Sequence, residues 1–206
     1  MSPESAAPAI SSRIVQLFVE AALQEVGAEN LPRMLEMVSL SPSVIEKDSL
    51  DNLNGMRSAE LYALLQQALR LFYGRGARGI LSRIGYGIWE RITTRTNFLE
   101  KTELEVVRWL PVPARRRRVL DMIAGRFRAG GGAASVHTLD LDLLLVDHSA
   151  AAACGQSSDE PICYVTLGII QGALFWATGQ EADVEEVTCK ATGAQACEFK
   201  VKLGGK

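Results

Sequence analysis

The sequence predicts an α+β protein in which N-terminal helices precede an antiparallel sheet that packs around one central buried helix. Two observations lead to this class. Apolar residues recur at helical spacing through residues 11–130, whereas strand and hairpin patterns appear in residues 135–206. Helices first and strands later is the order typical of α+β folds. With 206 residues, the chain has the length of a single domain, which we place at residues 11–206.

The first helices follow from their end signals. Residues 1–10 have neither a basic start nor an apolar core, so we expect a disordered tail rather than a secretory signal. Ser11 or Ser12 suits the N-cap of a helix that ends at Gly27. A short helix is expected over residues 29–37 and a long connection over residues 39–55.

Three more helices are expected before the sheet. Residues 58–73 are strongly amphipathic, and residues 77–94 continue the helical period with several glycines that would let another backbone come close. Pro111 and Pro113 break the chain, and residues 115–128 form the next helix.

The period then changes from helix to strand. Apolar and polar residues are interleaved between Val136 and Leu145 and alternate strictly from Leu139 to Leu143, which predicts a half-buried strand. Residues 183–191 and 195–203 flank a turn centred on Gly193, which predicts a hairpin.

The most apolar segment lies between these strands. Residues 162–177 are shorter than the roughly 20 residues that span a bilayer, so we expect a buried core helix and no membrane span. Asp159 is the expected cap of this helix, with Pro161 in its first turn.

The charge balance excludes some partners. The 22 basic and 24 acidic residues give a net charge of −2, so nucleic acid is not an expected partner. Without an export signal, the expected location is the cytoplasm, where cysteines stay reduced. Basic residues are most concentrated at residues 115–118, which are four arginines. They form either a patch for an acidic partner or a helix face that meets the acidic half of this chain or of a second subunit. We favour the helix face, because charge runs are usually solvated surfaces.

The sequence offers little for catalysis. Residues 74–79 match G-x-G-x-x-G, but they follow a helical pattern, so a helix–helix turn is the better interpretation than a nucleotide site. A nucleophile elbow, HExxH and a P-loop are absent from the sequence. His137 and His148 are lone histidines, which more often have structural roles. We therefore name no catalytic residue.

The cysteines are more informative. Cys189 and Cys197 are equidistant from Gly193, so a symmetric hairpin would place them opposite each other on one face. Cys163 adds a third sulfur at the start of the buried helix. In a regular strand Glu185 shares a face with Cys189, and Glu186 joins it only if the strand begins or bulges between them. The alternatives to a metal site are a disulfide or three small apolar side chains.

At this point the C-terminal third resembles the 4-vinyl reductase domain family. The resemblance rests on Cys163, a glycine-bearing helix, a Glu-x-x-Cys strand ending at Cys189, a glycine turn and a final Cys197-x-Phe199. It implies an α/β sandwich related to TRAPP subunits, usually a homodimer. It also implies a zinc held by three cysteines and a glutamate, which correspond here to Cys163, Glu186, Cys189 and Cys197. A zinc with four protein ligands is structural.

Some members of the family are sensor domains of bacterial activators that respond to phenols. The phenol-contacting His and Trp of those domains fall here on Ala114 and Asp142, and with shifted loops Trp109, His137 or Trp176 would take such roles. The alternative for Trp109 and Trp176 is packing in the core, which we favour. We therefore expect a non-catalytic domain that binds or senses a hydrophobic, aromatic or tetrapyrrole molecule and acts through a partner. The alternatives are an accessory protein or vinyl reductase of bacteriochlorophyll synthesis, although flavin and nicotinamide signatures are absent, and an assembly scaffold.

Overall fold

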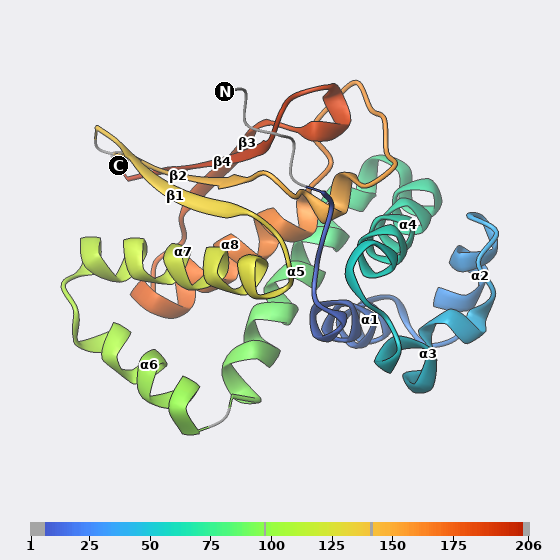
Figure 1. Ribbon diagram of the computed structural model, residues 1–206, viewed down its shortest axis with the longest axis horizontal. Helices are drawn as coiled ribbons and strands as arrows, with labels where there is room; N and C mark the ends of the chain where they lie inside the picture. The colour runs from blue at the N-terminus through green and yellow to red at the C-terminus, as the bar shows by residue number, and fades with distance from the viewer. Residues whose placement is uncertain (1–6, 97, 141, 204–206) are drawn as a thin grey trace.

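The structure is a computed structural model that describes residues 7–96, 98–140 and 142–203 (Figure 1). The α-helices are α1 (Ser12–Val26), α2 (Leu31–Glu36), α3 (Lys47–Asp51), α4 (Gly55–Tyr73), α5 (Ala77–Thr94), α6 (Phe98–Trp109), α7 (Val112–Ala129) and α8 (Tyr164–Thr178). The strands are β1 (Ala134–Leu139), β2 (Asp142–Asp147), β3 (Asp183–Thr188) and β4 (Cys197–Lys202). Short 3₁₀ helices are η1 (Pro42–Ile45), η2 (Gly74–Gly76), η3 (Ala151–Ala153) and η4 (Lys190–Thr192). The predicted α+β class is confirmed.

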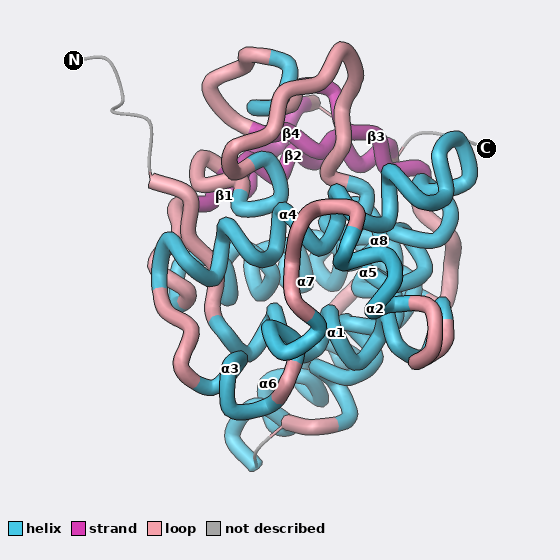
Figure 2. The backbone as a smooth tube through the Cα atoms, turned by 90° about the vertical axis from the view of Figure 1, so that its right-hand side faces the viewer, coloured by secondary structure: helices cyan, strands magenta, loops and turns pink. Residues whose placement is uncertain are grey.

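The described strands form one antiparallel sheet that lies across the helices. Its order is β1-β2-β4-β3, so the C-terminal hairpin is inserted beside β2. Helices α7 and α8 pack against one face of the sheet, and α5 packs beneath α8 (Figures 1 and 2). Helices α1 to α4 lie on the other side of α5 from α7, at the right of Figure 1, and α4 packs against η3. The central helix α8 therefore has a sheet on one side and helices on the other, which is why it is apolar all round.

Helices α5 and α8 touch backbone to backbone, because glycines face each other at their crossing. A Cβ atom at Gly85 would overlap the Val165 carbonyl oxygen, and one at Gly168 would overlap the Ser82 carbonyl oxygen. At Gly172, a Cβ atom would lie 3.2 Å from the Cα atom of Tyr86. Of the α5 glycines that were expected to let another backbone come close, Gly85 does so. Gly79 does not, because a Cβ atom there would lie near only the end of the Arg83 side chain.

The helix boundaries follow local chemistry closely at the N-terminus. The Ser11 side chain accepts a hydrogen bond from the Ile14 backbone N–H, and Gly27 ends α1 with a φ of 87°. Residues 1–6 of the expected tail lie outside the described residues, whereas Ile10 is buried in the core. The connection expected over residues 39–55 is wrong in part, because η1 and α3 lie within it. These short turns carry few apolar residues and left no periodic signal.

Two other expectations are corrected. The single strand expected between Val136 and Leu145 is a hairpin of β1 and β2, with Asp140 at a φ of 48° in the turn. Alternation continues through such a hairpin, and this turn has no glycine or proline to mark it. The N-cap position of the buried helix is held by Cys163 rather than Asp159, without a side-chain capping bond, so α8 begins later than expected. Helix α6 was not predicted, since only Leu104 and Val107 of its described side chains are buried.

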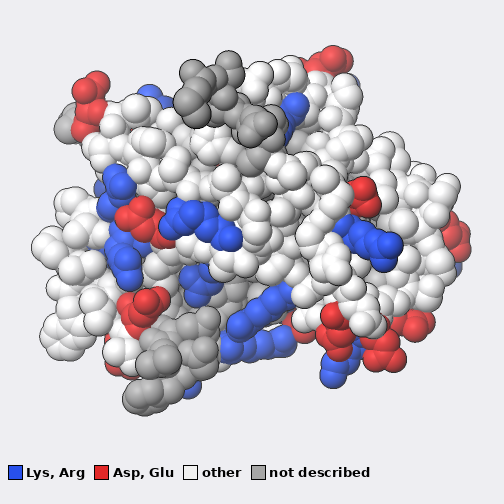
Figure 3. Space-filling view, in the orientation of Figure 1, with Lys and Arg blue, Asp and Glu red and all other residues white. Residues whose placement is uncertain are grey.

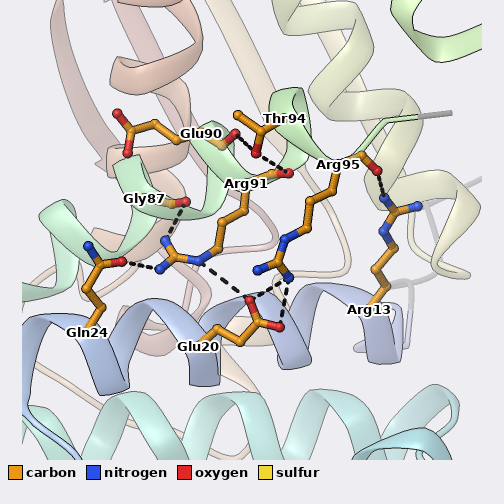
Figure 4. A network of polar contacts seen from close by, with 8 residues as sticks. All are labelled: Arg13, Glu20, Gln24, Gly87, Glu90, Arg91, Thr94 and Arg95. Atoms are coloured by element: carbon orange, nitrogen blue, oxygen red, sulfur yellow. Dashed lines mark hydrogen bonds and ion pairs between the residues drawn. The ribbon is translucent and has the colours of Figure 1, made fainter. Parts of the chain in front are cut away.

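A polar seam joins α1 to the far end of α5 (Figure 4). The Arg95 Nη1 lies 2.7 Å from a Glu20 carboxylate oxygen, and the Arg91 Nε lies 3.6 Å from the same carboxylate. Arg91 also donates to the Gln24 side chain, and Arg13 donates to the Arg95 carbonyl oxygen at 3.1 Å. Exposed ion pairs contribute little one at a time, so this seam fixes orientation more than it adds stability.

The arginine run at residues 115–118 makes contacts within the chain. Arg117 donates to the Val136 carbonyl oxygen at 2.9 Å, which ties α7 to β1. Arg115 donates to the Leu110 carbonyl oxygen at 2.6 Å, and Arg116 reaches the Gln180 side chain at 3.3 Å. Basic and acidic side chains lie next to one another at a few places on the face in Figure 3, at its left and its lower right. Within the described part of the chain, no helix is long and apolar enough to cross a membrane.

The glycine contact yields a stability prediction. Gly168→Ala should lower the free energy of unfolding by about 1–3 kcal/mol, because the new methyl group pushes α8 away from the Ser82 backbone. Gly79→Ala is the control on α5, and it should raise the free energy of unfolding by up to about 1 kcal/mol, because alanine is the better helix former. Urea denaturation measures both, and equal effects of the two changes would contradict the packing described.

Candidate metal centre

Three cysteines and a glutamate meet where α8 begins beside the β3–β4 hairpin. Cys163 is the N-cap of α8, Cys189 follows β3, and Cys197 opens β4. The ligand atoms of these cysteines and Glu186 all lie within 4.8 Å of one another, and all four residues are buried. The structure thus brings together the four residues that the family resemblance named.

An irregularity in β3 determines which glutamate joins the cluster. Thr188 pairs with Glu198, which is the register symmetric about Gly193, but Glu186 pairs with Phe199. The register therefore shifts between Glu186 and Thr188, as a β-bulge does, and Glu186 turns inward. Glu185 points outward instead, and its carboxylate lies 3.0 Å from the Lys202 Nζ.

The sulfur atoms form a compact triangle. The Cys163 Sγ lies 3.8 Å from the Cys189 Sγ and 3.4 Å from the Cys197 Sγ, and the remaining Sγ–Sγ distance is 3.8 Å. A tetrahedron with Zn–S bonds of about 2.3 Å has S–S edges of about 3.8 Å. The spacing excludes a formed disulfide, whose S–S bond is about 2.05 Å. All three cysteines are free thiols in this structure.

The Glu186 carboxyl group lies at the fourth corner of the cluster, beside the three sulfur atoms. Its Oε2 accepts a hydrogen bond from the Cys163 backbone N–H at 2.8 Å, which fixes the carboxylate at the start of α8. Its other oxygen, Oε1, is buried and has no hydrogen-bond partner. An unpaired buried carboxylate oxygen is costly, and a cation beside it would remove that cost.

The acidic groups of the cluster shift one another's pKa values, because they lie close together. Burial raises the pKa of the Glu186 carboxyl group to about 8, and the nearby Cys189 adds to the rise. Hydrogen bonds between the Cys163 sulfur and the Cys189 and Cys197 sulfurs raise the pKa of Cys163, and the bond with Cys163 lowers the pKa of Cys189. A divalent cation would have to displace protons from these groups, so its affinity should fall as the pH falls.

The three residues predicted to contact a small-molecule ligand, Trp109, His137 and Trp176, do not lie around one site. Trp109 ends α6 with 88% of its surface exposed. His137 is exposed on β1 and bonds the Ser135 hydroxyl at 2.8 Å. Trp176, on α8, packs edge-on against Trp89 with ring centroids 6.0 Å apart. None of the three lines the cavities described below.

Two cavities that sequence reasoning missed lie beside the metal-ligand cluster. One, of about 460 Å³, lies between the end of α4, the η2 turn and residues 156–164. The other, of about 440 Å³, lies between α8 and β3, and Glu186 is among its lining residues. Tyr164 and Arg78 line both cavities. The G-x-G-x-x-G run forms the helix–helix turn at η2, as expected, and it contributes to the first cavity.

The fold is similar to that of solved H-NOX proteins. An H-NOX protein from S. oneidensis, solved in an Fe(II)NO ligation state, aligns with a TM-score of 0.57 and 14% identity over 95% of this chain and 100% of that one. A second structure, described in terms of haem redox potential and porphyrin distortion, aligns with a TM-score of 0.56 and 11% identity over 94% of this chain and 100% of that one. At such identities the likeness concerns the fold alone.

The family resemblance is confirmed by a match in sequence. Residues 144–203 match the family model of the 4-vinyl reductase domain, the family expected above. The match runs from β2 through α8 to the end of β4, and it includes all four residues of the cluster. An uncharacterised protein of Methanocaldococcus jannaschii, MJ0745, is 43% identical over 47 residues, which cover 23% of this chain and 26% of that protein. The matched segment thus spans about a quarter of its length.

The bulge gives a test of ligand choice. Glu186→Gln should weaken the affinity of the cluster for an added divalent metal ion by about tenfold or more, because it removes the carboxylate that faces the three sulfurs. Glu185→Gln is the matched control, and it should leave that metal affinity unchanged, because Glu185 lies on the opposite face with Lys202. Competition with a chromophoric chelator measures both affinities. Equal losses in the two variants, or a loss only in Glu185→Gln, would show that Glu186 is not a ligand.

Proposed function

We propose that this chain is a non-catalytic domain that binds or senses a small molecule and is held together by a structural zinc. The observation that carries the proposal is the buried cluster of Cys163, Glu186, Cys189 and Cys197 beside two cavities. The match to the 4-vinyl reductase domain over the same residues supports it.

The donor set favours zinc. Three thiolates and one carboxylate are ligands that Zn²⁺ accepts, and four protein ligands leave no position for a water molecule. Such a closed site is structural rather than catalytic. The ion would be held by Cys163 from the start of α8 and by three residues of the C-terminal hairpin.

The position of the cluster explains what a structural ion would do. Beyond Thr188 the ladder between β3 and β4 gives way to η4, so few strand hydrogen bonds hold this end of the hairpin. Lys190 donates its backbone N–H to the Cys197 sulfur at 3.3 Å, and Ser158 donates to the Ala191 carbonyl oxygen at 2.9 Å. A zinc would clip this end to α8, whose glycines hold it to α5.

The cavities support a binding role. Both have volumes within the range of about 300–1,000 Å³ that small-molecule sites occupy. The similar H-NOX structures carry small ligands on the same fold, which supports the general class and not a particular molecule. The hydrophobic or aromatic ligand and the homodimer rest on the family resemblance.

A histidine-ligated haem does not fit this chain, although the fold neighbours include a haem protein. The chain has two histidines. His137 is exposed on β1, His148 follows β2, and neither histidine lines either of the two cavities. The backbone contact at Gly85 and Gly168 also fills the space between α5 and α8. We therefore derive no haem chemistry for this protein.

Metal analysis tests the zinc. Purified protein should contain about one zinc per chain, and removal by a chelator should lower the melting temperature. Cys189→Ser should do the same, because it leaves three ligands, with a loss of unfolding free energy on the order of several kcal/mol. Cys154→Ser is the control, since Cys154 lies outside the cluster. Protein that is free of metal and equally stable, with or without chelator, would rule out the structural zinc.

Native mass spectrometry tests the binding role. Protein purified from its own host should carry a bound or exchangeable small molecule together with the metal. Protein that holds its zinc but takes up no ligand in broad screens would favour the scaffold alternative.

A further inference from the structure

The larger of the two cavities has the chemistry of an anion site. It lies between the end of α4, the η2 turn and the segment that leads into α8, and its volume is about 460 Å³. Three arginines line it, Arg70, Arg75 and Arg78, together with one acidic residue, Glu160. We call it the arginine cavity. The excess of positive charge favours an anionic occupant.

The Arg70 guanidinium group is held in place by one hydrogen bond, while another of its nitrogen atoms has no partner. Its Nη2 donates to the Gln156 side chain at 2.8 Å, and Gln156 in turn donates to Gln67 at 3.4 Å. Its Nη1 is buried and has no hydrogen-bond partner. A buried cationic donor without an acceptor is costly, so an acceptor at this point would be stabilising.

The other two arginines are also available. Among the residues that the structure describes, none of the three forms an ion pair with a carboxylate, although other arginines of the chain do. Arg78 lies over the Tyr164 ring with its Cζ 6.0 Å from the ring centroid, which steadies it without neutralising it. Arg75 lies in the η2 turn at the rim.

The backbone of this region adds to the positive potential. Helix α5 begins at Ala77, which lines the arginine cavity and whose backbone N–H donates to the Gly74 carbonyl oxygen. The dipole of a helix favours an anion near its N-terminus. A phosphate group has several acceptor oxygens and up to two negative charges, so it matches donors that arrive from several elements better than a carboxylate does.

We propose that the arginine cavity binds the phosphate group of a small molecule, with Arg70 as the principal contact and Arg75 and Arg78 at the rim. This deepens the proposed binding function, on which it rests, by naming a place and a chemical class for the ligand. The segment that closes the cavity runs through Ile162 and Tyr164, on either side of Cys163. An occupant would therefore touch the chain directly beside the metal-ligand cluster.

The test uses the full, zinc-loaded chain and inorganic phosphate or pyrophosphate as probes, with calorimetry at constant ionic strength. Arg70→Gln should weaken pyrophosphate binding by about tenfold or more, because it removes a charged donor. Arg57→Gln is the matched control: it removes the same charge from the exposed first turn of α4 and should leave binding unchanged. Arg78→Gln, at an exposed position, should weaken binding without disturbing the buried contacts of Arg70.

The outcomes separate this proposal from the zinc proposal. Zinc content is measured on every sample, so a variant that loses phosphate binding with its zinc intact supports the arginine cavity. Wild-type protein that holds zinc but binds neither probe at millimolar concentration overturns the phosphate proposal and leaves the zinc proposal standing. Equal binding by Arg57→Gln and both cavity variants also overturns it. Binding of benzoate in place of phosphate, lost in Arg70→Gln, would overturn phosphate in favour of a carboxylate ligand.

Discussion

The structure depends on the backbone contact between α5 and α8. Gly85 and Gly168 let the two helices approach more closely than any side chain would allow, and this contact fixes α8 beneath the sheet. Because α8 is held there, its first turn lies at a defined place beside the C-terminal hairpin. Cys163 caps that turn, so the packing of glycines at one point positions a sulfur atom at another.

The hairpin meets α8 through a local irregularity rather than through regular strand geometry. A regular β3 would have turned Glu185 toward Cys189 and left Glu186 outside. The register shift after Glu186 reverses this, and the Glu186 carboxylate then accepts the Cys163 backbone N–H. Helix α8 thereby gains an acceptor for a backbone N–H at its N-terminus, where such groups have no partner within the helix. One bulge thus serves both the helix cap and the metal-ligand cluster.

The same first turn connects the cluster to the cavities. Ile162 and Tyr164 flank Cys163 and line the arginine cavity, while Glu186 lines the cavity on the other side of Tyr164. A ligand in either cavity would therefore contact Tyr164, which is adjacent in sequence to Cys163 of the cluster. In the proposed function, the zinc keeps these walls in place, and the arginines decide what enters.

The sequence by itself determined the α+β class, the ends of α1, the extent of α5 and the approach of Cys189 to Cys197, because caps, helical period and spacing about Gly193 are local signals. The full set of four residues came from the family resemblance. It left Glu185 and Glu186 open, since a bulge shows only in the pairing of two strands. It also missed α6 and the β1–β2 turn, where local signals are weak. Only the tertiary structure shows that Trp109, His137 and Trp176 lie apart and do not form one ligand site. Only the tertiary structure shows that Arg70, Arg75 and Arg78 line one cavity together with Gln156. The three arginines are close in sequence, but Gln156 lies far from them in the chain, and no local pattern records that these two segments meet.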